Sequence, residues 1–376
     1  MSNALNRVKN WIKNRSRFIA IILEHLTVLR QTLLTWIRNR RRLIVSTSAF
    51  LLTLTSFIIA LSILYYQYPA SFEATWKGRT YYLFFTWLFV LEAMLSWEEL
   101  KPKITKLKSI RTIAFAGALT LPTAYVVIAN YYGLNATIEK MSTQYSVGMP
   151  QWMPLSTEYL VLTVLFAFII FLHYGMNGLN NFSIATVFLG AMGLIYIIND
   201  LYPYGKFMPF QIIVPTTASL AASTLRWMGY HTLFLGDPMG LPTYVAWDNH
   251  NNYSGAFAIA WPCSGVESLI IYSIVILLFL KKSNISWVAR TVYFVIGAIV
   301  TYFINVLRIA TIFLISINGG NVSQFHDYYG QLYSITWIIS YPLIIIGVQA
   351  LSRRLNIGSR LHLRLQAIKH IKPRPS

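Results

Sequence analysis

Apolar runs recur along the chain and are separated by short polar or basic segments. An α-helix rises 1.5 Å per residue, so about 20 apolar residues are needed to cross the ~30 Å hydrocarbon core of a bilayer. The runs predict eight spans, at 43–66, 80–97, 112–132, 157–174, 183–202, 264–280, 288–310 and 331–352. The pattern therefore predicts an all-α polytopic integral membrane protein.

The stretch 207–227 is also apolar, but a ninth span there would place Lys281, Lys282 and the basic residues after Ala350 outside the cell. That placement would reverse the usual excess of basic residues on the cytosolic side. Two prolines interrupt the stretch, and Arg226 follows two serines at helical spacing. We therefore expect an amphipathic helix on the outer surface.

Three short β-like runs follow this helix, with turn residues between them. They are Thr232–Leu235, Thr243–Trp247 and Ala256–Trp261, and Gly, Pro, Asp and Asn fill the intervening positions. This order predicts a small three-stranded meander that lies outside the membrane and leads into the next span.

Charge refines the topology. Hydrophobic residues make up 56% of the 376 residues and charged residues 11%, yet the net charge is +19. Ten basic residues lie in 1–42 and seven in 353–376, beside membrane spans, so the charge indicates cytosolic segments near anionic lipid and not a nucleic-acid partner. Phe18–Leu29 is too short to cross and is expected to lie in the cytosolic interface. No cleavable signal peptide is expected.

These patterns divide the chain into five segments. The predicted order is a basic cytosolic or interfacial segment (1–42), five spans (43–206), an extracytoplasmic helix with short strands (207–262), a catalytic core of three spans (263–352) and a basic cytosolic tail (353–376).

The only cysteine, Cys263, lies where the polar meander meets an apolar run, in Trp261-Pro262-Cys263-Ser264-Gly265. A helix N-terminus favours the thiolate, which is the reactive form of cysteine. One cysteine excludes an intramolecular disulfide and a multi-cysteine metal site. No phosphate-binding loop or nucleotide motif is present, so neither a cofactor nor a metal is predicted.

Two further residues can meet this thiol. Cys263 precedes Lys281 by 18 residues and Arg308 follows Arg290 by 18, which places both roughly 27 Å above a cytosolic basic anchor. A charge within a membrane helix is a functional hypothesis by default. His326 lies in the outer loop before the last span and joins the other two if that loop folds inward.

Three motifs in this order resemble the exosortase/archaeosortase family over about 253–350. The amino-acid sequence around the cysteine is most similar to that of an archaeal member. The three motifs are Pro262-Cys263-Ser264-Gly265, Asn305-Val306-Leu307-Arg308-Ile309 and Phe325-His326-Asp327. The resemblance implies a membrane-embedded cysteine transpeptidase. Its partners would be exported proteins with a C-terminal tail of short motif, hydrophobic span and basic cluster, and a membrane lipid that accepts the new carboxyl end.

The chemistry of the residues agrees with that activity. Cys263 would attack the scissile carbonyl, His326 would transfer protons, and Arg308 would stabilise the thiolate or the oxyanion. Four residues are expected to support them: the backbone N–H groups of Ser264 and Gly265 as oxyanion donors, Glu267 as an ion-pair partner of Arg308, and Asn305 in the same polar pocket.

Two other functions stay open at this point. A membrane acyltransferase could use the same cysteine, although the cytosolic Asp-His-His-Cys cluster of typical palmitoyl transferases is absent. A transporter would be expected to have interrupted spans in paired halves and polar groups at the midplane. The predicted location is the cell membrane, with both termini cytosolic and the active site outside.

Overall fold

The computed structural model describes residues 27, 29–35, 45–75, 77–97, 99–100, 109–203, 207–238, 241–249, 253–283 and 285–369. The predicted interfacial segment Phe18–Leu29 falls almost wholly outside these ranges. Several of the predicted turn residues, 239–240 and 250–252, also lie outside them.

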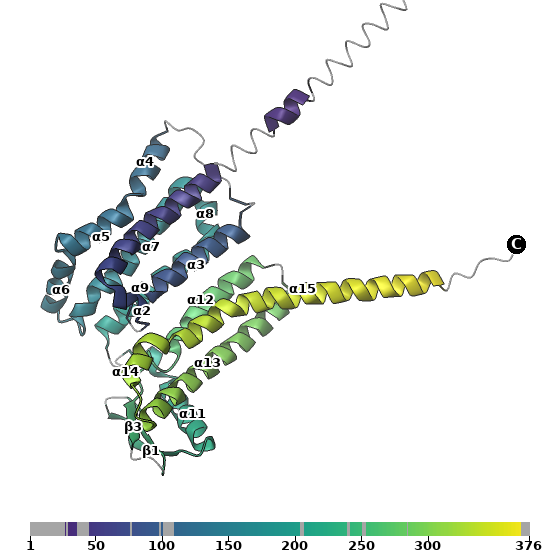
Figure 1. The fold of residues 1–376 in the computed structure, drawn as a ribbon. Coiled ribbons are helices and arrows are strands. Elements are labelled where there is room, and N and C mark those ends of the chain that lie inside the picture. The colour runs from purple at the N-terminus through teal and green to yellow at the C-terminus, as the bar shows by residue number, and fades with distance from the viewer. Residues whose placement is uncertain are drawn as a thin grey trace, which may run out of the picture.

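The described elements form two groups along the chain (Figure 1). The first comprises the helix Val45–Gln67, α2 (Pro69–Glu73), α3 (Thr80–Leu95), α4 (Ile110–Ala118), α5 (Leu121–Tyr131), α6 (Leu134–Gln144), the 3₁₀ turn η1 (Pro150–Trp152), α7 (Met153–Tyr174), α8 (Met176–Asn181) and α9 (Ser183–Leu201). The second comprises α10 (Met208–Gln211), α11 (Val214–Trp227), β1 (His231–Gly236), β2 (Thr243–Trp247), β3 (Ser254–Ala258), α12 (Val266–Lys282), α13 (Trp287–Ile317), α14 (Val322–Gln324), the π turn η3 (Phe325–Tyr329) and α15 (Leu332–Lys369).

Six helices in the described ranges are long and apolar enough to cross a membrane. They are Val45–Gln67, Ile110–Tyr131, Pro150–Tyr174, Ser183–Leu201, Trp287–Ile317 and Val322–Ser352. The two other predicted spans correspond to α3, with 16 residues, and α12, with 17. At 1.5 Å per residue each is roughly 25 Å long, shorter than the hydrocarbon core, so the count of eight stays a prediction.

Helix α9 joins the two groups, because it packs against α7 and α3 of the first group and against α12 of the second. Aromatic rings fill the core of the first group. Phe166 meets Phe57, Phe85 and Phe89 edge to face, with ring centroids 5.0–5.5 Å apart. Such contacts add to the burial of a large apolar area, so this bundle presents a rigid wall to the second group.

The meander predicted after residue 231 is present. Strands β1, β2 and β3 form an antiparallel sheet in that order, with Val245 opposite both Leu233 and Ala256. The stretch predicted as a surface helix is helical too, as α10 and α11, and the 14 residues of α11 span only about 21 Å. The helix and the sheet lie together at one end of the helical bundle (Figure 1).

Two helices end later than predicted. Helix α15 continues 17 residues beyond the predicted end at 352, to Lys369, and α13 continues seven residues beyond the predicted end at 310, to Ile317. The extra two turns of α13 lie against β3, where Phe313 meets Phe257 edge to face. A Cβ at Gly255 would come 2.9 Å from Ser316, so the strand passes close to the helix. The extension therefore supports the sheet, and Arg308 lies within the helix and not at its outer end.

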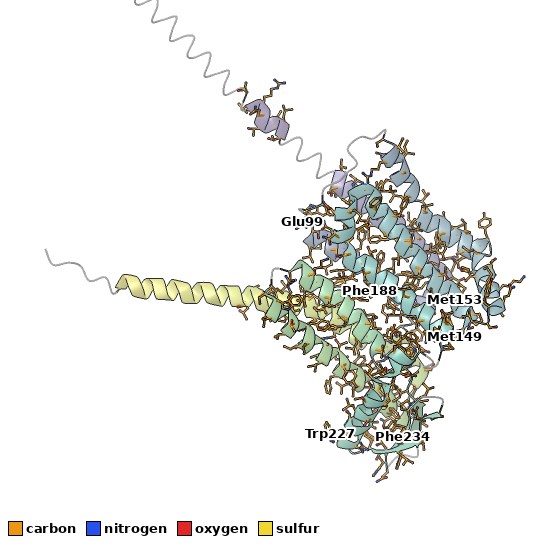
Figure 2. All side chains as sticks on the ribbon, turned by 180° about the vertical axis from the view of Figure 1, so that it is seen from behind. Glu99, Met149, Met153, Phe188, Trp227 and Phe234 are labelled. Atoms are coloured by element: carbon orange, nitrogen blue, oxygen red, sulfur yellow. The ribbon has the colours of Figure 1, made fainter. Side chains whose placement is uncertain are left out.

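Exposed aromatic side chains mark the end that carries the sheet. Trp227 is 88% exposed and Phe234 52% exposed, and both project there, whereas Glu99 lies at the other end (Figure 2). Trp is enriched where a membrane meets water. This end of the bundle therefore suits an interfacial position.

Candidate active site

Cys263 lies in a tight turn that connects β3 to α12. Its backbone N–H donates to the Ala260 carbonyl at 3.0 Å. Gly265 caps the helix with a φ of +95°, which favours glycine, and a Cβ there would come 2.8 Å from the Asn305 side chain. The Pro-Cys-Ser-Gly motif thus forms a turn that sets a half-buried thiol just before the first turn of α12.

The structure gives Ser264 a structural part in this turn. Its N–H donates to the carbonyls of Ala260 and Trp261, each at 3.1 Å, and its hydroxyl donates to the Trp261 carbonyl at 2.8 Å. The predicted use of this N–H as an oxyanion donor is therefore wrong for the geometry observed, because the group is already engaged. The N–H of Gly265 remains a candidate.

His326 reaches the thiol from the segment between α13 and α15. Its Nε2 lies 3.2 Å from the Cys263 Sγ, and its Nδ1 lies 3.1 Å from Oδ1 of Asp327. The residue belongs to the π turn η3, a type of turn that is frequent at functional sites. The loop before the last span thus folds inward, as expected. Cys263, His326 and Asp327 form a Cys–His–Asp series, of which the sequence analysis had predicted the cysteine and the histidine.

Arg308 lies beside this series and is fully buried. Its Nη1 donates to the Asn305 side chain at 3.4 Å, and the Asn305 amide donates to the Cys263 carbonyl at 3.0 Å. Nε and Nη2 of Arg308 have no hydrogen-bond partner among the described residues. A buried guanidinium with two open donors beside a thiol is suited to bind an oxygen that gains negative charge.

Gly330 explains how the guanidinium fits. A Cβ at this position would lie 2.8 Å from Nε of Arg308, so the chain can pass over the guanidinium only as glycine. Sequence reasoning named Asp327 within a motif but gave it no role, and it did not name Gly330. The available signals were an acid directly after the histidine and a glycine four residues after it.

Glu267 has a different partner from the one expected. It is 4% exposed and accepts a hydrogen bond at 3.2 Å from the Tyr81 hydroxyl, which comes from the first turn of α3. The structure has no direct ion pair between Glu267 and Arg308, so the predicted pair is replaced by a contact with the N-terminal group of helices. Among the described residues, no carboxylate lies within salt-bridge distance of the guanidinium.

Opposing effects act on the pKa of the Cys263 thiol. Burial raises the pKa of Cys263, but the hydrogen bond and charge of His326 and the charge of Arg308 lower it more, and the pKa lies below its ordinary value. A lowered pKa increases the thiolate fraction near neutral pH. Within the described residues, no group of three or more His, Cys, Asp and Glu side chains is placed to hold a metal ion.

A thiol, an imidazole and a carboxylate thus lie in series at one end of a bundle of apolar helices, an arrangement suited to nucleophilic catalysis by cysteine. The chain matches the family model described as transmembrane exosortase (Exosortase_EpsH) over residues 76–341. It belongs to this family, which confirms the resemblance drawn from the three motifs and implies a sorting transpeptidase role. No curated protein and no solved structure gave a significant match.

Proposed function

We propose that the protein cleaves the C-terminal sorting tail of exported proteins and transfers the new carboxyl end to a membrane lipid. The observation that carries the proposal is the Cys263–His326 contact of 3.2 Å beside a buried Arg308, two of whose nitrogens have no hydrogen-bond partner in the part of the chain that the structure describes. A nucleophile, a base in hydrogen-bond reach and open donors are the three parts that acyl transfer requires.

The first half-reaction forms a thioester. The Cys263 thiolate attacks the scissile carbonyl carbon, and the carbonyl oxygen takes the negative charge and faces Nε and Nη2 of Arg308. The tetrahedral intermediate collapses when the C–N bond breaks, and the protonated His326 gives its proton to the leaving amine. Asp327 holds the imidazole through Nδ1 during this transfer.

The second half-reaction reverses these roles. His326 takes the proton from a hydroxyl or amine of the acceptor lipid, whose oxygen or nitrogen attacks the thioester carbonyl. The C–S bond breaks and the thiolate is restored. Because both substrates meet the enzyme at the end of the bundle that carries the sheet, a lipid headgroup and the outer end of a substrate helix can both approach the thiol.

We infer from the basic segments that both termini are cytosolic and that Cys263 faces outside. In α12, Cys263 precedes the first turn and Lys281 lies at the last, so the two are at opposite ends of the helix. The test uses the fact that Cys263 is the only native thiol. An impermeant maleimide should label it in intact cells, whereas labelling only after lysis would overturn this orientation.

The covalent intermediate gives the sharpest test of the reaction. When acceptor lipid is removed, the enzyme should accumulate a substrate-peptide thioester on Cys263, detected by mass spectrometry and discharged by neutral hydroxylamine. A fatty acyl mass on Cys263 would favour a lipid acyltransferase. The absence of any adduct, with substrate present and intact, would favour a non-enzymatic role such as transport.

A further inference from the structure

The chain between α2 and α3 makes a sharp corner, defined here as residues 74–75 and 77–81. The corner is tightly built. A Cβ at Gly78 would overlap the carbonyl oxygen of Ala74, so the turn needs glycine. The Thr80 hydroxyl donates to the carbonyls of Phe72 and Ala74 at 2.8 and 2.9 Å. These contacts hold the described residues of the corner close together.

Two buried ion pairs fix this corner to the helices behind it. Lys77 pairs with Asp200 of α9, and Arg79 makes two parallel bonds to Glu158 of α7, at 2.8 and 2.9 Å. The Tyr159 hydroxyl also donates to the Gly78 carbonyl at 3.0 Å. Breaking a buried pair by removing one partner typically costs about 3–5 kcal/mol, so each pair strongly resists displacement of the corner.

The same corner contacts two parts of the active site, the segment that contains His326 and the helix that follows Cys263. From Thr75, which is 1% exposed, both the N–H and the hydroxyl donate to the Asp327 carbonyl, the hydroxyl at 2.9 Å. From the other end of the corner, the Tyr81 hydroxyl donates to Glu267, one turn below Cys263. Thr75 and Asp327 are more than 180 positions apart in the chain, and so are Tyr81 and Glu267. The corner thus connects distant segments.

The contact from Thr75 ties the base side of the pair to the first group of helices, whereas the Ser323 hydroxyl, which donates to Oδ2 of Asp327 at 3.0 Å, belongs to the same segment as the base. The side chains of His326 and Asp327 are 24% and 40% exposed, and they lie in a π turn, which leaves the regular helical hydrogen-bond pattern. Two donors on one carbonyl fix the peptide plane of Asp327. The carboxylate that contacts the imidazole extends from this restrained backbone.

We propose that Thr75 is a positioning residue, which transmits the rigidity of the α2–α3 corner to His326 and so sets the His326–Cys263 distance. The inference rests on the proposed function, because it assigns to the first group of helices a role in the proposed cysteine chemistry. A difference of about 1 Å at a reacting group can cost about 100-fold in rate, so such an anchor has a measurable consequence.

The test is the pH dependence of Cys263 alkylation by iodoacetamide in purified protein, which needs no substrate. The rate rises as pH passes the pKa of the thiol, because the thiolate is the nucleophile. The wild-type midpoint should lie below ~8.5, the value of an ordinary cysteine, and His326→Asn should raise it. Thr75→Val should raise it by at least about 0.5 unit, toward the value of His326→Asn, because a displaced imidazole stabilises the thiolate less.

Controls separate positioning from a general effect on stability. Thr75→Ser retains both donors and should restore the wild-type midpoint. Thr186→Val removes a hydroxyl that bonds only within its own helix and should leave the midpoint unchanged. If Thr75→Val does not accumulate as a monodisperse protein, Thr75→Ala removes the same hydroxyl with a smaller side chain.

The outcomes distinguish the two proposals. A midpoint that moves in His326→Asn but not in Thr75→Val would overturn the positioning role alone. A midpoint unmoved by His326→Asn would overturn the Cys–His pairing on which the proposed function depends, and the positioning role with it. If Thr75→Val shifts the midpoint equally in the presence and absence of His326→Asn, Thr75 does not act through the histidine.

Discussion

Two buried arginines in this molecule have opposite surroundings. Arg79 makes two short bonds to Glu158, which also accepts from the Tyr82 hydroxyl. Arg308 is fully buried and makes one long bond to Asn305, with Nε and Nη2 unpartnered in the described part of the chain. A buried charge with all its partners stabilises a fold, whereas a buried charge with open donors costs stability and is suited to bind a substrate.

The different surroundings of the two arginines indicate different roles for the two groups of helices. The first group contains the paired charges and the aromatic core, and it forms the wall against which the corner at Thr75 is fixed. The second group contains the thiol, the imidazole and the open guanidinium. Apart from residues that contact the site, such as Thr75 and Tyr81, substitutions in the first group should therefore act mainly on stability, and those in the second mainly on the rate per folded molecule.

The largest expected effect is the loss of the nucleophile. Cys263→Ala should reduce removal of the sorting tail at least about 1,000-fold, because the covalent route is lost, while the protein still accumulates in the membrane. Immunoblots of the substrate would show its larger, unprocessed form. Retention of a tenth or more of wild-type processing would contradict the assignment of Cys263.

The next effect compares the two arginines directly. Arg308→Lys retains the charge but loses the planar set of donors, so processing should fall roughly 100- to 1,000-fold with little change in melting temperature. Arg79→Lys loses one of the two bonds to Glu158 and should lower the free energy of unfolding by about 1.5–3 kcal/mol.

Both variants are assayed for rate per folded molecule and for thermal unfolding in the same detergent. The comparison fails if Arg79→Lys reduces the rate per folded molecule as much as Arg308→Lys does. It also fails if alanine at position 308 supports full processing.

A smaller effect should follow from crowding the guanidinium. Gly330→Ala places a methyl group 2.8 Å from Nε of Arg308, so the arginine must shift and processing should fall about 10- to 100-fold. Gly347→Ala, in helix α15, is the matched control, since a Cβ there meets nothing within 4 Å. Equal processing by the two variants would show that the close approach of Gly330 has no functional consequence.

The sequence predicted the elements better than it predicted the contacts between them. Apolar runs and turn residues were sufficient for the three strands and for the helical conformation of α11, because both depend on local pattern. The end of α13 was missed because its last two turns are stabilised by β3, a tertiary contact. The pairing of Tyr81 with Glu267 was missed for the same reason, since nothing local indicates which distant hydroxyl will reach a buried carboxylate.

The candidate site shows the same limit. Cys263, Arg308 and His326 could be proposed from chemistry and motif order, and the structure brings them together. The engagement of the Ser264 N–H in its own turn could not be predicted, because it depends on the backbone conformation between Ala260 and Gly265. The role of Gly330 could not be predicted either, because it depends on the position of the Arg308 guanidinium in the folded protein.

The smallest effect distinguishes two adjacent tyrosines of α3, both fully buried, whose hydroxyls belong to different networks. Tyr81 donates to Glu267 below the thiol, and Tyr82 donates to Glu158 in the fully paired network. Each Phe substitution removes one hydrogen bond to a carboxylate, which costs about 1.5–3 kcal/mol in a buried site. Tyr81→Phe should therefore reduce processing about 3- to 10-fold, because the carboxylate near the thiol loses its donor and moves.

Tyr82→Phe should lower the unfolding temperature and leave the rate per folded molecule within about 2-fold of wild type, because Arg79 still holds Glu158 by two bonds. The measurement is a single-turnover processing assay beside a thermal melt for each variant. If the two substitutions have the same ratio of rate loss to stability loss, the division between a structural and a catalytic network does not hold at this helix. If only Tyr81→Phe slows the reaction, the boundary between the two networks lies between adjacent residues of α3.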